Sequence, residues 1–188
     1  MELALYNNTY DAFCSCIETI NPAILELGCG PGNITRYLLS KRPDFKISGI
    51  DVAPNMIELA KVNNPAAEFK VMDCRTIDKL SGKFEGIIGG FCIPYLSKED
   101  CCKLLRDCYH LLNKNGCLYL SMMEGDYFKS GFETGSTGDQ VYIYYHPEAF
   151  FRETLIENNF ELQHFVRIAH SKNDGSKQPE LVFIAKKP

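Results

Sequence analysis

Residues 24–33 read Ile-Leu-Glu-Leu-Gly-Cys-Gly-Pro-Gly-Asn, and this stretch decides the fold of the chain. The apolar residues at its start are typical of a buried strand. The glycines that follow let the backbone turn sharply and approach a ligand closely, because no Cβ stands in the way. Residues 33–39 have the pattern of the first turns of a helix. A strand, a glycine turn and a helix in this order open a nucleotide-type α/β site.

The spacing of the glycines separates two kinds of nucleotide ligand. A pyrophosphate-binding turn usually reads G-x-G-x-x-G. Here the glycines alternate at Gly28, Gly30 and Gly32, and they follow the carboxylate of Glu26. An acidic residue at that place suits a ligand with an ammonium group and a sulfonium rather than one with two phosphates.

Residues 26–32, Glu-Leu-Gly-Cys-Gly-Pro-Gly, resemble the first motif of class I S-adenosylmethionine-dependent methyltransferases. Later segments follow that family's order along nearly the whole chain. The resemblance implies a Rossmann-like α/β fold whose doubly wound, mostly parallel sheet has seven strands, with an antiparallel C-terminal hairpin. It also implies an enzyme that uses S-adenosylmethionine to methylate a small-molecule acceptor.

Length and composition fit one such domain. A chain of 188 residues is ample for a single core and short for two domains, so residues 1–188 are predicted to form one methyltransferase domain. The net charge of −4, the pI of about 5.6 and the lack of a long basic run disfavour a nucleic-acid substrate. The composition assigns no oligomeric state.

Hydropathy and cysteine usage indicate a cytoplasmic protein without a membrane partner. No apolar stretch approaches the roughly 20 residues that cross a bilayer, and the N-terminus lacks the shape of a signal peptide. The nine cysteines are odd in number and show no paired C-x-x-C spacing, so we expect reduced thiols in the core and no metal site.

Periodicity predicts alternating strands and helices. The predicted strands cover residues 23–27, 45–50, 68–72, 84–89, 117–122 and 141–145, before a hairpin of 161–169 and 181–186 across a turn at 171–179. The predicted helices cover residues 9–20, 33–41, 54 onward, 97 to the Asn-Gly pair at 115–116, and 147–158. This order indicates a doubly wound sheet with its ligand at the carboxyl ends of the strands.

Two carboxylates follow predicted strands. Asp51 can accept both hydroxyl protons of a ribose, although it can instead be the N-cap of the helix that begins at Pro54. The resemblance implies that Asp73 accepts the adenine amino group while the backbone N–H of Cys74 meets a ring nitrogen. Asp73 can alternatively serve only to form a turn.

The other cofactor contacts are also implied by the resemblance. The Gly28 carbonyl and the Glu26 side chain are expected near the methionyl ammonium, although Glu26 can instead orient the glycine loop. Tyr10 is expected to close over the cofactor, with an exposed helix start as the alternative. Phe91 and Tyr95 are expected at the mouth where the methyl group is transferred. The complete predicted cofactor set is Tyr10, Glu26, Gly28, Cys29, Gly30, Gly32, Asp51, Val52, Met56, Asp73, Cys74 and Phe91.

The acceptor side gives weaker signals. Methyl transfer from a sulfonium is an in-line displacement, so the protein mainly aligns the reactants, and a hydroxyl acceptor also needs a general base. The predicted catalytic residues are Glu124, Tyr142 and His146. The intrinsic pKa of His146 suits a base, but its place before Pro147 also suits a helix cap. Residues 124–146 are predicted to supply a substrate lid and an extra strand.

Two other functions share part of this pattern. An NAD-dependent Rossmann oxidoreductase also uses a glycine turn and an acidic residue such as Asp51, but the glycine spacing and the lack of a separate substrate domain argue against it. A non-catalytic S-adenosylmethionine-binding module is the second alternative, because the sequence shows no obvious base.

Overall fold

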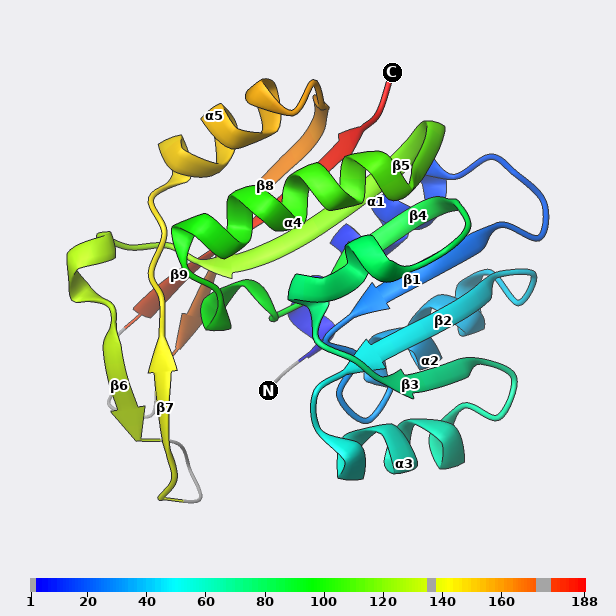
Figure 1. Cartoon of the computed structure of the whole chain (residues 1–188), viewed down its shortest axis with the longest axis horizontal. Helices are drawn as coiled ribbons and strands as arrows, with labels where there is room; N and C mark the ends of the chain where they lie inside the picture. The colour runs from blue at the N-terminus through cyan, green and yellow to red at the C-terminus, as the bar shows by residue number, and fades with distance from the viewer. Residues whose placement is uncertain (1–2, 135–137, 172–176) are drawn as a thin grey trace.

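One seven-stranded sheet organises the chain, which the computed structural model describes over residues 3–134, 138–171 and 177–188 (Figure 1). Its strands are β1 (Ala23–Leu27), β2 (Lys46–Asp51), β3 (Glu68–Val71), β4 (Phe84–Gly89), β5 (Leu112–Met123), β8 (Glu161–Ser171) and β9 (Lys177–Lys186). They lie in the order β3-β2-β1-β4-β5-β9-β8. β1 to β5 are parallel, and β9 is antiparallel to both of its neighbours, which confirms the predicted sheet and hairpin.

Helices cover both faces of this sheet. They are α1 (Asn7–Cys16), α2 (Asn33–Lys41), α3 (Pro54–Asn63), α4 (Lys98–Leu111) and α5 (Glu148–Glu157), with short 3-10 turns η1 (Leu3–Tyr6), η2 (Cys74–Lys79), η3 (Ile93–Tyr95) and η4 (Tyr127–Lys129). α1 and α2 bury Phe13 and Leu38 on one face, whereas α4 and α5 bury Leu104 and Phe151 on the other. The central strands are covered on both sides, which explains their nearly continuous apolar sequences.

The strand order reverses between β1 and β4, which are neighbours in the sheet. The loops that leave these two strands therefore run to opposite faces and leave a crevice at their carboxyl ends. β2 and β3 continue the sheet on one side of that point, so their carboxyl ends reach the same edge. The fold thus gathers the loops after β1, β2, β3 and β4 at one place.

A separate hairpin stands beside the main sheet (Figure 1). It consists of β6 (Gly131–Thr134) and β7 (Gln140–Ile143). Tyr144 donates a backbone hydrogen bond of 2.7 Å to the carbonyl of Pro94, which ties this unit to η3. β6 lies inside residues 124–146, for which only one strand, at 141–145, was predicted, and residues 135–137 of that segment lie outside the described residues.

The predicted helix over residues 9–20 is wrong at its end, because α1 stops at Cys16. The backbone of Ile17 is already extended. The guanidinium of Arg42 donates hydrogen bonds to the carbonyls of Ile17 and Thr19, at 2.8 and 2.9 Å. These carbonyls are thereby satisfied outside a helix. Ile20, the last residue of the predicted helix, is 79% exposed.

The predicted boundary between α4 and β5 is also wrong. The helix ends at Leu111, and Leu112 already pairs with Phe84 of β4. The next registered pair is Gly86 with Cys117, so the residues between Leu112 and Cys117, including the predicted Asn-Gly stop, form an excursion within the strand. β9 likewise begins at Lys177 rather than at residue 181, and residues 172–176 of the predicted turn lie outside the described residues.

None of the helices in the described segments is both long and apolar enough to span a bilayer.

Candidate cofactor-binding site

A cavity of about 210 Å³ opens at the carboxyl edge of the sheet, where the loops after β1, β2, β3 and β4 meet. Its lining consists of Gly28, Asp51, Val52, Met72, Asp73, Cys74, Arg75, Phe91, Cys92, Tyr95 and Leu96. Half of the predicted cofactor residues lie in this lining, as does Tyr95, which was expected at the methyl-transfer mouth. Most of the remaining lining is apolar, as is usual in small-molecule sites.

The glycine turn brings the backbone to this cavity. Gly28 has a φ of +63°, and a Cβ there would lie 3.0 Å from the Cβ of Cys92. Gly32 is the N-cap of α2 with a φ of +80°, and a Cβ on it would lie 2.2 Å from Nδ2 of Asn64. Both positions combine a left-handed backbone with a close neighbour, which explains why glycine occupies them.

Asp51 connects the first two loops of the site. Its Oδ2 accepts the backbone N–H of Gly30 at 2.8 Å, and its Oδ1 accepts that of Ala53 at 2.9 Å. The N-cap of α3 is Ala53, so the alternative that Asp51 caps this helix is wrong. Each carboxylate oxygen keeps accepting capacity beyond its backbone donor.

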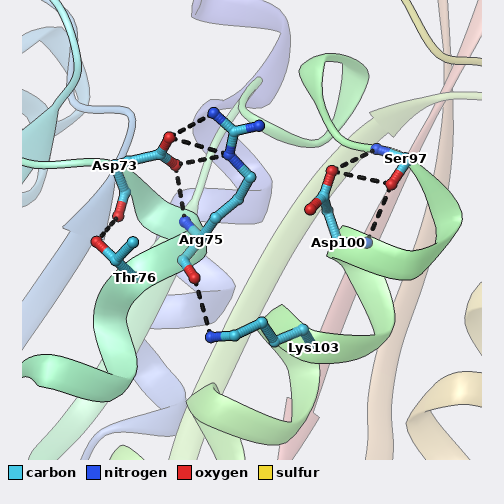
Figure 2. A network of polar contacts seen from close by, with 6 residues as sticks. All are labelled: Asp73, Arg75, Thr76, Ser97, Asp100 and Lys103. Carbon is cyan, nitrogen blue, oxygen red and sulfur yellow. Dashed lines mark hydrogen bonds and ion pairs between the residues drawn. The ribbon is translucent and has the colours of Figure 1, made fainter.

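Asp73 forms a turn and lines the cavity at the same time (Figure 2). Its side chain accepts the backbone N–H of Arg75 at 2.9 Å, and the guanidinium of Arg75 binds both of its oxygens. This ion pair lowers the pKa of Asp73. Lys103 of α4 donates to the carbonyl of Arg75 at 2.9 Å, which fixes η2 against the helix (Figure 2). Asp73 therefore does form a turn, and it also lies in the cavity lining.

Two polar side chains beneath the glycine turn are buried without a full set of partners. Glu26 is 1% exposed, and burial raises its pKa to about 7. The hydroxyl of Thr35 donates to its Oε2, whereas Oε1 has no partner in the described part of the chain. Tyr10 is also 1% exposed, and its hydroxyl likewise has no partner there. Tyr10 is therefore not the exposed helix start that was considered as an alternative.

The other predicted cofactor residues lie around the cavity without lining it. Cys29, Gly30 and Gly32 belong to the glycine turn, and Met56 is half-buried on α3. Burial raises the pKa of the Cys29 thiol, which disfavours its thiolate.

The structure does not bring the three predicted catalytic residues to the cavity lining. His146 is fully buried, and its Nε2 lies 3.0 Å from the carbonyl of Leu96. Burial lowers its pKa to about 4, and it does not cap α5, whose N-cap is Pro147. Glu124 is adjacent to His146 through an isolated β-bridge.

Glu124 and Tyr142 are both engaged elsewhere. Arg167 donates to both carboxylate oxygens of Glu124 at 2.8 Å. Tyr142 is 39% exposed on β7, and its ring lies 4.8 Å from that of Tyr144.

Sequence reasoning missed four residues of the lining: Met72, Arg75, Cys92 and Leu96. Each one is next to a predicted residue or within a few positions of one. Their places in the loops that follow the predicted strands could therefore have indicated them. In the described segments, no group of His, Cys, Asp or Glu is arranged to hold a metal ion.

Comparisons with known proteins agree with this architecture. Residues 24–116 match the family model described as a methyltransferase domain. A putative methyltransferase of Invertebrate iridescent virus 6 is 36% identical over 80 residues, which is 43% of this chain and 30% of that protein. The demethylmenaquinone methyltransferase of Thermotoga maritima is 30% identical over 105 residues, which is 55% of this chain and 45% of that protein. The chain therefore spans less than half of these curated relatives.

Solved structures resemble the chain over nearly its whole length. An S-adenosylmethionine-dependent methyltransferase of Methanosarcina mazei has a TM-score of 0.76 at 21% identity, covering 91% of this chain and 94% of that one. One of Clostridium acetobutylicum has a TM-score of 0.78 at 13% identity, covering 100% and 92%. At these identities the structures establish the fold. The sequence match over residues 24–116 to a methyltransferase domain and the fold shared with these structures agree with the resemblance of the glycine turn to class I S-adenosylmethionine-dependent methyltransferases.

Proposed function

We propose that this protein binds S-adenosylmethionine in the cavity beside Gly28 and transfers its methyl group to a small-molecule acceptor. The observation that carries the proposal is the meeting of Gly28, Asp51, Asp73 and Phe91 in one cavity at the carboxyl edge of the sheet. These residues come from four separate loops, in a chain whose residues 24–116 match a methyltransferase domain.

The adenosine half of the cofactor fits the outer part of this cavity. Asp51 is oriented by two backbone donors and keeps accepting capacity for two ribose hydroxyls. Val52 and Met72 offer apolar walls for a purine. The predicted contacts of Asp73 with the adenine amino group and of Cys74 with a ring nitrogen are compatible with their places in the lining.

The methionine half fits the unsatisfied polar groups beneath the glycine turn. Leaving a buried donor or acceptor without a partner costs about 1–3 kcal/mol. Oε1 of Glu26 and the hydroxyl of Tyr10 are two such atoms in the described part of the chain. The charge of Glu26 contributes, after burial, to raising the pKa of Tyr10. An ammonium and a carboxylate on one ligand would supply the missing partners.

The chain's own contribution to the reaction is mainly positioning. When bound, the cofactor supplies a sulfonium methyl group that a lone pair of the acceptor displaces in line. Phe91 and Tyr95 both line the cavity, where their rings can flank the methyl group. Such alignment lowers the barrier by several kcal/mol, up to about 10 in favourable cases.

Glu124, Tyr142 and His146 remain the proposed groups on the acceptor side. With a pKa of about 4, the buried imidazole of His146 is neutral at physiological pH and can accept a proton, which it then holds weakly. Arg167 pairs with both carboxylate oxygens of Glu124. Tyr142 lies on the hairpin, where it can contact an acceptor.

A small-molecule acceptor is supported by the names of several relatives. They include a trans-aconitate 2-methyltransferase of Enterobacter, 46% identical over 52 residues, and the demethylmenaquinone methyltransferase. One similar structure, from Burkholderia thailandensis, is a 1,6-didemethyltoxoflavin N1-methyltransferase with its acceptor bound. The comparisons favour neither the NAD-dependent oxidoreductase nor the non-catalytic binding module.

Titration calorimetry tests the cofactor assignment. We expect S-adenosylmethionine and S-adenosylhomocysteine to bind and NAD not to bind. Asp51→Ala is expected to weaken S-adenosylhomocysteine binding by at least about 100-fold, because charge-assisted hydrogen bonds to the ribose are lost. Glu58→Ala, which removes an exposed carboxylate of α3, serves as the matched control.

Thermal melting by circular dichroism checks that the Asp51 variant is folded. Binding of NAD alone, or unchanged affinity in a folded Asp51→Ala variant, would contradict the proposal. Transfer of a labelled methyl group to components of a metabolite extract then separates the enzyme from a binding module.

A further inference from the structure

A second cavity, of about 880 Å³, lies between η4 and the start of α4. It borders the cofactor cavity along one short segment of chain: Tyr95 and Leu96 line the first cavity, and Lys98 lines the second. Residues of η4, β6 and the start of β9 complete its wall. A molecule in the second cavity would therefore lie beside the mouth of the cofactor site.

The carboxylates in this wall already have donors. Arg167 donates to both oxygens of Glu124, and the side chain of Asp126 accepts the backbone N–H of Phe128 in η4. Tyr145 donates to Glu133 at 2.5 Å. Each carboxylate of the wall thus has at least one donor.

Lys98 differs from these carboxylates because its charge is not balanced by an ion pair in the described part of the chain. It is half-buried, and across the described residues no carboxylate lies within ion-pair distance of its ammonium. The ammonium lies 4.7 Å from the ring centre of Tyr127 and 5.2 Å from that of Phe150. These rings hold the cation in place but leave its N–H donors available. Lys98 is also the first residue of α4, where the helix dipole disfavours a cation.

The apolar part of the wall is aromatic. Tyr127 and Tyr145 line the cavity together with Phe128, which is 95% exposed. The ring of Tyr127 stacks on that of Tyr144 at 6.0 Å with an interplanar angle of 20°. A flat ligand can pack on such rings.

We propose that the methyl acceptor is a planar molecule with a carboxylate, and that Lys98 binds this carboxylate in the second cavity. The inference rests on the proposed function, because it assigns the cavity to the acceptor of the same reaction. A carboxylate is the anion proposed, and phenyl phosphate is its competitor in the test below. At the start of α4, the backbone N–H of Asp100 is already used. Ser97 and Asp100 form a reciprocal capping box there (Figure 2). The lining holds two ammonium groups, those of Lys98 and Lys129, and Lys98 is the half-buried one that lies against the aromatic rings.

Calorimetry on the protein saturated with S-adenosylhomocysteine tests this assignment. The probes are cinnamate, cinnamamide and phenyl phosphate. We expect cinnamate to bind at least about tenfold more tightly than its neutral amide, as befits a charge-assisted contact. Lys98→Met is expected to abolish this difference, whereas Lys98→Arg retains most of it. Lys70→Met, on exposed β3, is the matched control.

The outcomes separate the two proposals. Failure of the wild-type protein to bind S-adenosylhomocysteine would overturn the proposed function and this inference with it. If the wild-type protein binds S-adenosylhomocysteine normally, four other results would overturn this inference alone. They are equal affinity for cinnamate and cinnamamide, tighter binding of phenyl phosphate than of cinnamate, no binding of any probe, and an unchanged preference for cinnamate in Lys98→Met. Unchanged S-adenosylhomocysteine affinity in Lys98→Met, with loss of the cinnamate preference, supports it.

Discussion

At the scale of single residues, the protonation of the Glu26 carboxyl group is expected to depend on whether a ligand is bound. This carboxyl group is buried, Thr35 is its one side-chain donor in the described part of the chain, and its pKa is raised to about 7. A cationic group placed against Oε1 would favour the ionised form. The proton on Glu26 and the ammonium of the proposed cofactor therefore compete for the same oxygen.

This competition predicts that S-adenosylhomocysteine binds more tightly as the pH rises. Below about pH 7 the free protein must release the Glu26 proton to bind an ammonium, so affinity falls by up to about tenfold per pH unit toward acid. Calorimetry at several pH values, in buffers of different ionisation enthalpy, measures the affinity and counts the released protons. Glu26→Gln is expected to bind more weakly and without this pH dependence. An identical pH dependence in both proteins would show that Glu26 does not face the ammonium.

At the scale of secondary-structure elements, the glycine turn also joins two helices. Nδ2 of Asn64, a residue just past α3, donates to the carbonyl of Gly32 at 2.9 Å. Asn64 is 4% exposed, so its amide has little room to move. The turn thus fixes the start of α2 against the end of α3 while it shapes the cofactor cavity.

Gly32→Ala is therefore expected to lower the free energy of unfolding by about 2 kcal/mol, through left-handed strain and the contact with Asn64. Gly131→Ala is the matched control, since a Cβ there meets no atom within 4 Å. Urea denaturation of both variants measures the difference. Equal losses in the two variants would mean that the Asn64 contact relaxes freely.

At the scale of the whole molecule, a buried contact joins segments from near the two ends of the chain. The hydroxyl of Tyr6 in η1 donates to Oε2 of Glu180 in β9, across a separation of 174 positions. Glu180 is 3% exposed, and burial raises its pKa to about 7. The ring of Tyr6 also packs on Phe91 of the cofactor cavity at 4.8 Å. Tyr6 therefore links Glu180 of β9 to Phe91 of the proposed site.

The raised pKa of Glu180 makes global stability depend on pH. Between the unfolded value of 4.5 and the folded value of about 7, the native state binds more protons than the unfolded state. The stabilisation from this group is thus complete below the unfolded value and is lost as the pH rises through the folded one. The stability of Glu180→Gln relative to wild type should rise by up to about 3 kcal/mol over this window. Urea titrations at both limits measure the change, and a constant difference would refute it.

The features that could be predicted from sequence are those fixed by neighbouring residues. The glycine turn requires particular backbone angles, and Asp51 and Asp73 follow strands directly, so their places at the sheet edge were predictable. The buried partner of Glu180 was not, because Tyr6 lies far away in sequence. The ion pair of Asp73 with Arg75 also escaped notice, although the two residues are close in the chain.

Elements that depend on tertiary partners were predicted poorly. β6 is a short strand in a polar, glycine-containing segment, and it is a strand only because β7 pairs with it. α1 ends early because Arg42 binds the carbonyls beyond it. β5 begins early because Leu112 pairs with β4 across an excursion that sequence alone reads as a helix stop. In each case a distant contact overrides a local preference.

The position of β9 has a consequence for biosynthesis. This strand lies between β5 and β8 and bonds to both, yet it is translated after them. Until it leaves the ribosome, β5 has an open backbone edge, and the core lacks Leu181 and Phe183. A nascent chain in this state offers a strand edge and apolar surface to other chains. Slow translation of β9 should therefore increase aggregation and the need for chaperones.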